Sequence, residues 1–483
     1  MNPYFLFVTI ALPFIGGIAS YFMRGKTAHI KNTFLFIIVL CTTALTWLCV
    51  IFRPDGVFTL FSLTDTLRIS FQLDGLGSFF ACLVASLWPF AMIYSFEYMK
   101  NEKQLNVFYM FYTLTFGTTL GIAMSENLLT MYFFYELLTL VTLPLVIHPM
   151  TKKSSKAGRT YLYLSLAGSA FAFIGLVLLI SNTGSAEFVL GGIMNGKADN
   201  LNIFIYFLTF MGFGVKAVIF PVHIWLPQTT VAPTPVTALL HAVVVVKSGV
   251  FAIIRITYYN YGADYLRGTW AQTVCLIIVI FTILFGSVMS VKERHFKRRL
   301  AYSTISNLSY VLFGALLMTT AGFAAALLHM LFHAIIKICA FFCTGNVKYM
   351  TEREYCFQLD GLGKKMPLTF AAFTISAFAL TGVPLFCGFV SKWQLCTSAA
   401  DLGGTLPVIG VVVLIISALL TAIYMFSIVV RAYFCKGENL ADVKEAPLRM
   451  ILPLCVFAAF MIFFGIFSQP ILSLVTDIAS GIF

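Results

Sequence analysis

Apolar runs of about 20 residues, separated by short polar segments, follow one another along almost the whole chain. A run of that length can cross the hydrocarbon core of a bilayer as an α-helix, because a helix satisfies its own backbone polar groups there. The pattern therefore predicts an all-α polytopic membrane protein with about fourteen transmembrane helices. Their expected positions are 3–22, 33–52, 76–95, 106–124, 127–147, 160–180, 202–221, 236–257, 271–291, 299–319, 322–346, 367–399, 406–430 and 450–474.

Composition supports this interpretation. Hydrophobic residues make up 60% of the 483 residues and charged residues 10%, against about 45–50% and 25% in soluble domains. These values exclude soluble enzymes, disordered chains and fibrous proteins. The 11 cysteines contain no CxxC pair, and the phosphate-binding patterns GxxxxGKS/T and strand–GxGxxG are missing as well. We therefore expect no metal site and no cofactor bound by this chain.

Basic residues are concentrated in alternate loops. The loops after odd-numbered spans hold 22 Lys and Arg, and the loops after even-numbered spans hold 4. Because cytoplasmic loops carry the excess of positive charge, the count predicts a cell (inner) membrane protein with both termini on the outer side. The net charge of +12 is then a topology signal, and no nucleic-acid partner is expected.

A few charged residues lie inside the predicted spans, where each costs at least about 2.5–3.5 kcal/mol. Arg255 is near the end of its span, so we expect its guanidinium to reach the interface. The other charges are more central and are candidates for function: Glu136, Lys216, Lys247, Lys337 and Lys392. Opposite charges in such spans should find each other, which predicts that Glu136 and Lys216 form a coupled pair.

Four histidines accompany these charges. His329, His333 and Lys337 recur at intervals of four residues, so they share one face of the eleventh predicted helix. Two histidines at this spacing can bind zinc, but no third ligand is near and Lys337 would repel a cation. A proton path is the better account, because histidine titrates near neutral pH and a desolvated lysine can release its proton. His223 and His241 are accessory candidates.

Two predicted helices are interrupted, each next to a candidate lysine. Pro221, Pro227 and Pro233 follow Lys216 in the seventh span, and Gly382, Pro384 and Gly388 precede Lys392 in the twelfth. Unwound backbone at membrane depth is tolerated only against protein or a water-filled cavity. Corresponding breaks five spans apart predict two inverted repeats of five helices. The expected parts are 1–105 (helices 1–3), 106–257 (first repeat, helices 4–8), 271–430 (second repeat, helices 9–13) and 431–483 (helix 14).

The run GVKAVIFPVHIWLPQTTVAPTPVTALLHAVVVVKSGVF resembles the signature of a known family, the antiporter-like proton-translocating subunits. That family includes antiporter-like members of complex I, the D-like member of Mrp-type cation/proton antiporters and its counterparts in membrane-bound hydrogenases. Supporting runs are FFYELLTL, FKRRLAYSTISNLSYV, HMLFHAIIKICAFFCTG and LTGVPLFCGFVSKW. The resemblance implies fourteen helices and a polar axis. It matches Glu136 to the fifth helix, Lys216 to the broken seventh, Lys247 to the eighth, the histidine stripe to the eleventh and Lys392 to the broken twelfth.

The expected function is proton translocation, or sodium/proton exchange, in a multisubunit membrane complex energised by its partners. Those partners would be other antiporter-like and small membrane subunits, with or without a peripheral redox module, together with lipids. We expect no redox catalysis by the chain itself. Two alternatives stay open: a quinone- or substrate-binding membrane subunit of a redox enzyme, and a stand-alone solute carrier. The residues do not decide between the Mrp, hydrogenase or formate-coupled, and complex I assemblies, nor do they give the direction and stoichiometry of transport.

Overall fold

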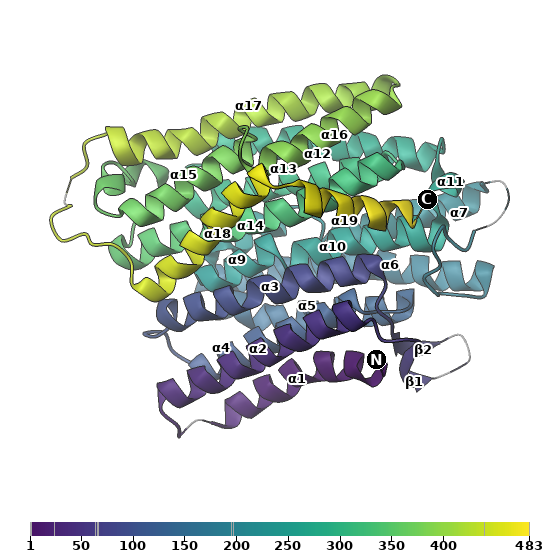
Figure 1. Ribbon diagram of the computed structural model, residues 1–483, viewed down its shortest axis with the longest axis horizontal. Coiled ribbons are helices and arrows are strands. Elements are labelled where there is room, and N and C mark those ends of the chain that lie inside the picture. The colour runs from purple at the N-terminus through teal and green to yellow at the C-terminus, as the bar shows by residue number, and fades with distance from the viewer. Residues whose placement is uncertain are drawn as a thin grey trace. The chain divides into compact units, whose positions relative to one another are not determined.

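The computed structural model describes residues 2–23, 25–62, 64, 67–194, 196, 198–438 and 440–482. Helices dominate the described chain (Figure 1). The chain divides into two compact units. Unit 1 comprises residues 1–216, 231–236 and 243–271, and unit 2 comprises residues 217–230, 237–242 and 272–483.

Unit 1 begins with a helical hairpin, α1 and α2. In this unit α1 packs against α2 and α4, α4 packs against α3 and α5, and α6 contacts α5 and α7. The α6–α7 contact is close because it uses small residues: a Cβ on Gly212 would lie 2.5 Å from the backbone nitrogen of Ala172. The helices of unit 1 are α1 (Tyr4–Phe22), α2 (Ala28–Phe52), α3 (Gly75–Tyr98), α4 (Leu105–Ala123), α5 (Leu128–Ile147), α6 (Lys152–Thr183), α7 (Asn200–Gly214), α10 (Val245–Arg255), the π-helix η2 (Ile256–Tyr261) and α11 (Ala263–Leu266).

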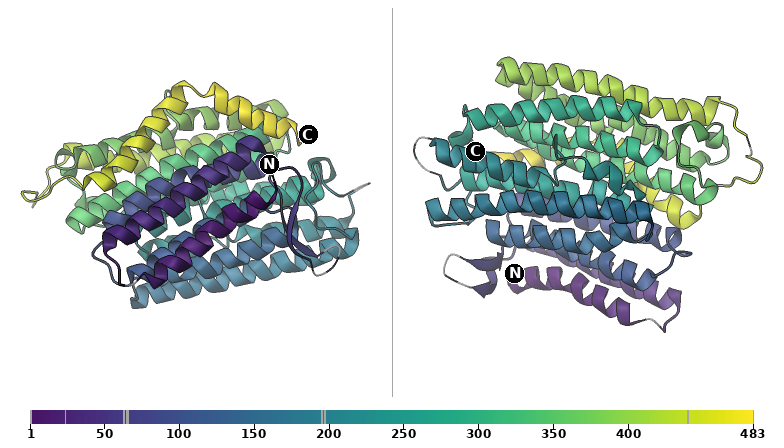
Figure 2. Two further views of the ribbon diagram at one scale, coloured as in Figure 1. Left: turned by 60° about the horizontal axis from the view of Figure 1, so that its bottom comes forward. Right: turned by 180° about the vertical axis from the view of Figure 1, so that it is seen from behind.

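A small antiparallel sheet joins α2 to α3, which the all-α prediction missed. Its strands are β1 (Phe58–Ser62) and β2 (Arg68–Phe71). The sheet lies beside the first turns of α1 (Figure 2), where the rings of Tyr4 and Phe58 are 5.0 Å apart. The alternation in this segment covers only four or five residues per strand, which is too short to stand out among long apolar runs.

Unit 2 is arranged around the long helix α14. In the most apolar 18-residue stretch of this helix 94% of the residues are buried, and the helix packs against α13, α15, α16, α18 and α19. In the corresponding stretch of α17 only 22% are buried, and α17 packs against α15 and α16. The elements of unit 2 are α8 (Trp225–Gln228), η1 (Thr229–Val231), α12 (Trp270–Lys292), α13 (Phe296–Leu316), α14 (Thr320–Thr351), η3 (Cys356–Gln358), η4 (Leu362–Lys364), α15 (Pro367–Thr381), α16 (Cys387–Leu402), α17 (Thr405–Phe434), α18 (Leu448–Ile466) and α19 (Gln469–Ser480). The division between the units runs through α9 (Thr234–Ala242), and it also leaves the first two residues of α12 in unit 1.

Each predicted span coincides with one or two of these helices. Among the described residues, 10 helical segments are long and apolar enough to cross a membrane. Some of the others, such as α7 and α15, are shortened by the predicted breaks. The chain is therefore a largely helical membrane protein, as its apolar pattern predicts.

Both predicted interruptions are present. Helix α7 ends at Gly214 and the next helix begins at Trp225. Helix α15 ends at Thr381, Gly382 takes φ +91°, and α16 begins at Cys387. A left-handed residue directly after a helix terminates it, and glycine adopts that conformation without a Cβ clash.

A third interruption was not predicted. The helical run from residue 234 breaks at Val243 and Val244 before α10 begins at Val245. The only local signal is the run of four valines at 243–246, whose β-branched side chains have a modest preference against helix. A run of valines without proline or glycine does not predict a helix break.

Candidate functional site

Lys216 lies in unit 1 two residues beyond the end of α7, at the first predicted break. Its side chain is fully buried. The ammonium donates a hydrogen bond to the carbonyl oxygen of Tyr135 on α5 and lies 3.4 Å from the centre of the Tyr135 ring. The Tyr135 hydroxyl in turn donates to the carbonyl oxygen of Phe213, 3.2 Å away. A buried ammonium is thus held by a carbonyl and an aromatic face.

Glu136 follows Tyr135 on α5 and is half-buried. Its carboxylate accepts a hydrogen bond from the Ser169 hydroxyl on α6. Among the described residues no ion pair within 4.0 Å joins Glu136 to Lys216, so the expected direct pair is absent from this structure. The two groups remain within electrostatic reach of each other. The ion pair does not form because each group has a nearer partner: the Ser169 hydroxyl for Glu136 and the Tyr135 carbonyl oxygen for Lys216.

Lys247 is in α10, three residues after the third interruption, and its side chain is fully buried. Every residue of α10 is buried, so this short helix runs through the interior of unit 1. The placement is the one expected for a functional intramembrane lysine.

Arg255, the last residue of α10, contradicts the expectation that it reaches the interface. Its side chain is buried and makes a two-pronged ion pair with Asp74, at 2.5 Å from Nη1 to Oδ2 and 2.6 Å from Nη2 to Oδ1. The guanidinium carbon also lies 4.4 Å from the centre of the Tyr259 ring. Asp74, whose side chain is 28% exposed, supplies the countercharge to the buried guanidinium, which removes the need to snorkel.

The histidine stripe of α14 faces α13 and α16 in unit 2. His329 and His333 are buried with ring centres 6.1 Å apart, and His329 Nδ1 lies 2.9 Å from the hydroxyl oxygen of Ser391 on α16. Lys337, also fully buried, donates to the carbonyl oxygen of Leu300 at 3.0 Å and to the Ser303 hydroxyl, both on α13. The three side chains share one helix face, as their spacing predicts.

Lys392 lies at the second predicted break, in the second turn of α16. Its Nζ donates to the carbonyl oxygens of Leu380 (2.6 Å) and Thr381 (3.2 Å). These are the last carbonyls of α15, which the break leaves without helical partners. The half-buried lysine therefore caps one half of the broken helix from the other half.

Tyr310 of α13 was not singled out by the sequence reasoning. Its ring stacks on His329 at 5.2 Å between ring centres and lies 5.3 Å from the Lys392 ammonium. It therefore stands between Lys392 and the histidine stripe. An aromatic residue in an apolar helix carries no local signal of such a position.

The accessory histidines lie among aromatic rings. The His223 ring is 4.7 Å from that of Phe285, and the His241 ring is 4.9 Å from that of Phe341. Within the described part of the chain, neither nitrogen of the buried His241 has a hydrogen-bond partner. No group of three or more His, Cys, Asp or Glu there could hold a metal ion.

Two basic residues that the loop count included are buried within the protein. Lys297 and Arg299 lie in the first turn of α13 and are 4% and 8% exposed. Arg299 donates to the carbonyl oxygens of Glu293 and Tyr424 and to the Ser427 hydroxyl.

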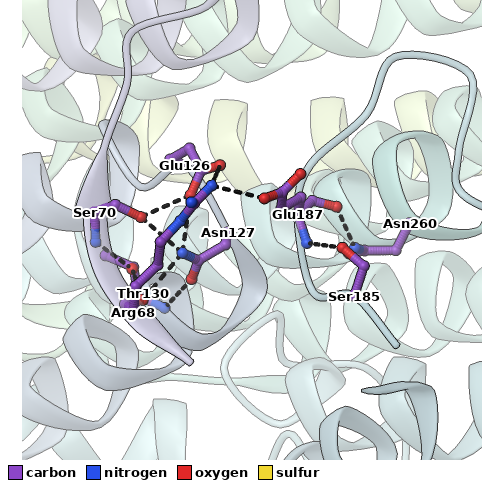
Figure 3. A network of polar contacts seen from close by, with 8 residues as sticks. All are labelled: Arg68, Ser70, Glu126, Asn127, Thr130, Ser185, Glu187 and Asn260. Carbon is purple, nitrogen blue, oxygen red and sulfur yellow. Dashed lines mark hydrogen bonds and ion pairs between the residues drawn. The ribbon is translucent and has the colours of Figure 1, made fainter. Parts of the chain in front are cut away.

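Arg68, assigned to a loop by sequence, is the centre of a polar network in unit 1 (Figure 3). It makes ion pairs with Glu126 (3.0 Å) and Glu187 (2.6 Å). Glu126 also accepts from the Ser70 hydroxyl (2.6 Å) and from the Asn127 amide (2.9 Å). The network ties β2 to the start of α5 and to the segment after α6.

These features define a class: a helical membrane protein whose broken helices carry buried lysines and whose central helix carries a histidine–lysine stripe. The comparisons place the chain within that class. A family model described as NADH:quinone oxidoreductase/Mrp antiporter, TM, matches residues 125–421, and one described as NADH-Ubiquinone oxidoreductase (complex I), chain 5 N-terminus, matches residues 61–109. The chain belongs to the family of antiporter-like membrane subunits that these models describe.

Individual relatives agree with this assignment. NADH-quinone oxidoreductase subunit N of Desulforudis audaxviator is 30% identical over 432 residues, which cover 85% of this chain and 84% of that protein. Na(+)/H(+) antiporter subunit A1 of Staphylococcus haemolyticus is 28% identical over 445 residues, which cover 86% of this chain and 55% of that protein. The chain thus spans about half the length of the antiporter relative.

Two solved structures share the fold. A chain of the Mrp complex from Dietzia sp. DQ12-45-1b matches with a TM-score of 0.86 at 22% identity, covering 98% of this chain and 96% of that one. A chain of the membrane-bound sulfane sulfur reductase, an archaeal respiratory membrane complex, matches with a TM-score of 0.87 at 25% identity, covering 99% and 97%. Both structures are multisubunit membrane complexes, which supports other membrane subunits as partners of this chain.

Proposed function

We propose that this chain translocates protons, with or without exchange for sodium, as a subunit of a multisubunit membrane complex. The observation that carries the proposal is the succession Lys392, Tyr310, His329 and His333 in unit 2: the Lys392 ammonium lies 5.3 Å from the centre of the Tyr310 ring, and the centres of successive rings lie 5.2 and 6.1 Å apart. Lysine and histidine can take up and release protons, and we infer that water carries them past the Tyr310 ring, whose hydroxyl donates to the carbonyl oxygen of Leu414.

Unit 1 contains a second set of charged side chains that can take part in proton transfer. Lys216 and Lys247 are fully buried, and Glu136 lies on α5 beside the carbonyl that holds Lys216. Lysine suits this role because its proton can leave when the surroundings become less polar or another cation approaches. His223 and His241, which belong to unit 2, are accessory groups in the proposal.

The proposal includes a finer architecture. We infer fourteen transmembrane helices, two inverted repeats of five helices with equivalent breaks before α8 and α16, and both termini on the outer side of the membrane. The observations in its favour are the two interruptions beside Lys216 and Lys392 and the alternation of basic loops. Energy would come from partner subunits, among them a peripheral redox module if the complex is of the respiratory type.

Lys392→Arg tests the proposal. Arginine keeps the charge and can still donate to the carbonyl oxygens of Leu380 and Thr381, but it does not release its proton at accessible pH. We expect the assembled complex to lose most of its ion transport in proteoliposomes while the subunit stays folded. Lys365→Arg, on an exposed loop residue, is the matched control and should transport normally.

Wild-type transport by Lys392→Arg would remove Lys392 from the path. The isolated chain offers a separate check, because a subunit energised by partners should not pump against a gradient alone. Coupled transport by the purified chain would favour a stand-alone carrier instead. Quinone-dependent protection of the chain from labelling would favour a substrate-binding subunit of a redox enzyme.

A further inference from the structure

A cavity of about 530 Å³ opens in unit 2 where α12 and α17 end. It is lined by Val291, Lys292, Arg294, Arg299, Cys356, Phe357 and Arg431. These residues come from three segments that follow the ninth, eleventh and thirteenth predicted spans. The alternation of loops predicts one membrane face for all three, and the cavity brings them together there. Its volume is that of a small-ligand site.

The lining carries four cations and little countercharge. Arg431 pairs with Asp360 at 3.1 Å, and Arg299 is fixed by the carbonyl oxygens it donates to. Lys292 and Arg294 are exposed, and neither forms an ion pair with a carboxylate among the described residues. The cavity therefore presents at least two uncompensated cations.

One neighbouring carboxylate, that of Glu293, offsets only part of this charge. One oxygen of Glu293 accepts hydrogen bonds from the backbone N–H groups of Arg294 and His295, each at 2.9 Å. This carboxylate is therefore held by the backbone of its own segment. Its other oxygen lies 4.0 Å from Arg298. Burial raises the pKa of the Cys356 thiol to about 11, which keeps it uncharged at neutral pH.

Helix dipoles explain the positions of only two of the four cations that line the cavity. Lys292 is in the last turn of α12 and Arg431 in the last turn of α17, where cations complement the helix dipole. Arg294 and Arg299 are outside those turns. The dipole also gives no reason for a cavity between the four side chains.

The rim of the cavity has the character of a membrane interface. The rings of Tyr355 and Phe357 are 43% and 54% exposed and stack at 5.5 Å between centres. Tyrosine is enriched at headgroup level in membrane proteins. Next to them, the last turns of α17 expose Val430 and Phe434, which offers an apolar surface to an acyl chain.

We propose that this cavity binds the phosphate of an anionic phospholipid, with the glycerophosphate between Lys292, Arg294 and Arg431 and the acyl chains along the exposed face of α17. Guanidinium and ammonium donors match phosphate oxygens. The apolar surface beside the cations favours a lipid over a free phosphate ion. Basic pockets between membrane helices on the cytoplasmic side are suited to such headgroups.

The test uses the full chain in neutral detergent and measures bound lipid by native mass spectrometry. Phosphatidylglycerol, phosphatidylcholine and inorganic phosphate are added separately. We expect binding of phosphatidylglycerol only, weakened by high salt. The double variant Lys292→Gln/Arg294→Gln should bind about 30-fold more weakly, at roughly fivefold per cation near an anionic surface.

A matched control removes two positive charges elsewhere on the same side. Lys364→Gln/Lys365→Gln changes exposed residues that do not line the cavity, and it should bind like wild type. A photoreactive phosphatidylglycerol should label the 352–366 segment in wild type and much less in the double variant. This readout does not depend on stability.

Three results would overturn the proposal. Equal loss of lipid in both double variants would mean that surface charge alone attracts the lipid. Equal binding of phosphatidylcholine would remove the role of the anionic headgroup. Competition of inorganic phosphate at the same concentration as the lipid would indicate a soluble anion as the occupant.

Discussion

The Asp74–Arg255 pair allows a quantitative test of the packing in unit 1. The Arg255 side chain is buried, and both of its terminal nitrogens donate to the two oxygens of Asp74 at 2.5 and 2.6 Å. Asp74→Asn removes the charge and keeps the shape. It also keeps an acceptor for the Gly77 N–H, so the N-cap of α3 survives. The variant therefore isolates the effect of an uncompensated buried guanidinium.

Removing one partner of a buried ion pair costs about 3–5 kcal/mol. We expect about 3 kcal/mol for Asp74→Asn, the lower end, because asparagine still accepts one hydrogen bond from Arg255. The free energy of unfolding is measured by denaturant titration in mixed micelles. The control is Asp264→Asn, whose partner Arg267 is 2.8 Å away but exposed, and a change of at most about 1 kcal/mol is expected.

A second variant separates charge from packing. Asp74→Asn/Arg255→Met removes both charges, so it should recover at least half of the lost stability although the hydrogen bonds are gone. A loss below about 1 kcal/mol for Asp74→Asn would refute this reasoning, as would a double variant less stable than the single one. Either result would mean that water or another group compensates Arg255.

Three further perturbations test the site and its surroundings. Glu136→Gln should suppress coupled ion transport in the assembled complex without preventing assembly, and full activity would remove Glu136 from the mechanism. Gly388→Ala places a Cβ 1.8 Å from the carbonyl oxygen of Ala379, so thermal unfolding should show a destabilisation of at least about 2 kcal/mol. A neutral effect would contradict the close approach of α15 and α16. The His295 imidazole, with Nε2 3.6 Å from one carboxylate oxygen of Glu354, and the Lys348 ammonium, which donates to the other oxygen, lower the pKa of Glu354 from 4.5 to about 2. The stability that Glu354 contributes should therefore be complete above about pH 4.5 and fall as the pH decreases toward 2, and Glu354→Gln should lack that decline.

Much of the candidate site follows from local sequence. The spacing of His329, His333 and Lys337 determines a shared helix face wherever the helix packs. The prolines after Lys216 and the glycines before Lys392 predict where helices stop, because they act on the backbone of their own segment. These predictions agree with the described structure.

The errors concern residues whose state depends on distant partners. Arg255 is buried because Asp74, 181 residues earlier in the chain, accepts both of its terminal nitrogens. Glu136 likewise bonds Ser169, a partner that the sequence did not indicate, although it remains within electrostatic reach of Lys216. Neither partner is marked by a pattern near the residue that uses it.

The sequence by itself determined the membrane setting, the approximate positions of most helices, the two breaks beside lysines and several of the buried charges, because hydrophobicity, helical period and proline or glycine content are local properties. Only the tertiary structure decided which group satisfies each charge. A buried polar group needs a partner, and that partner is selected by which helices pack together. Tyr310 between Lys392 and His329, and the four cations around one cavity, therefore became visible only when segments far apart in the chain were placed side by side.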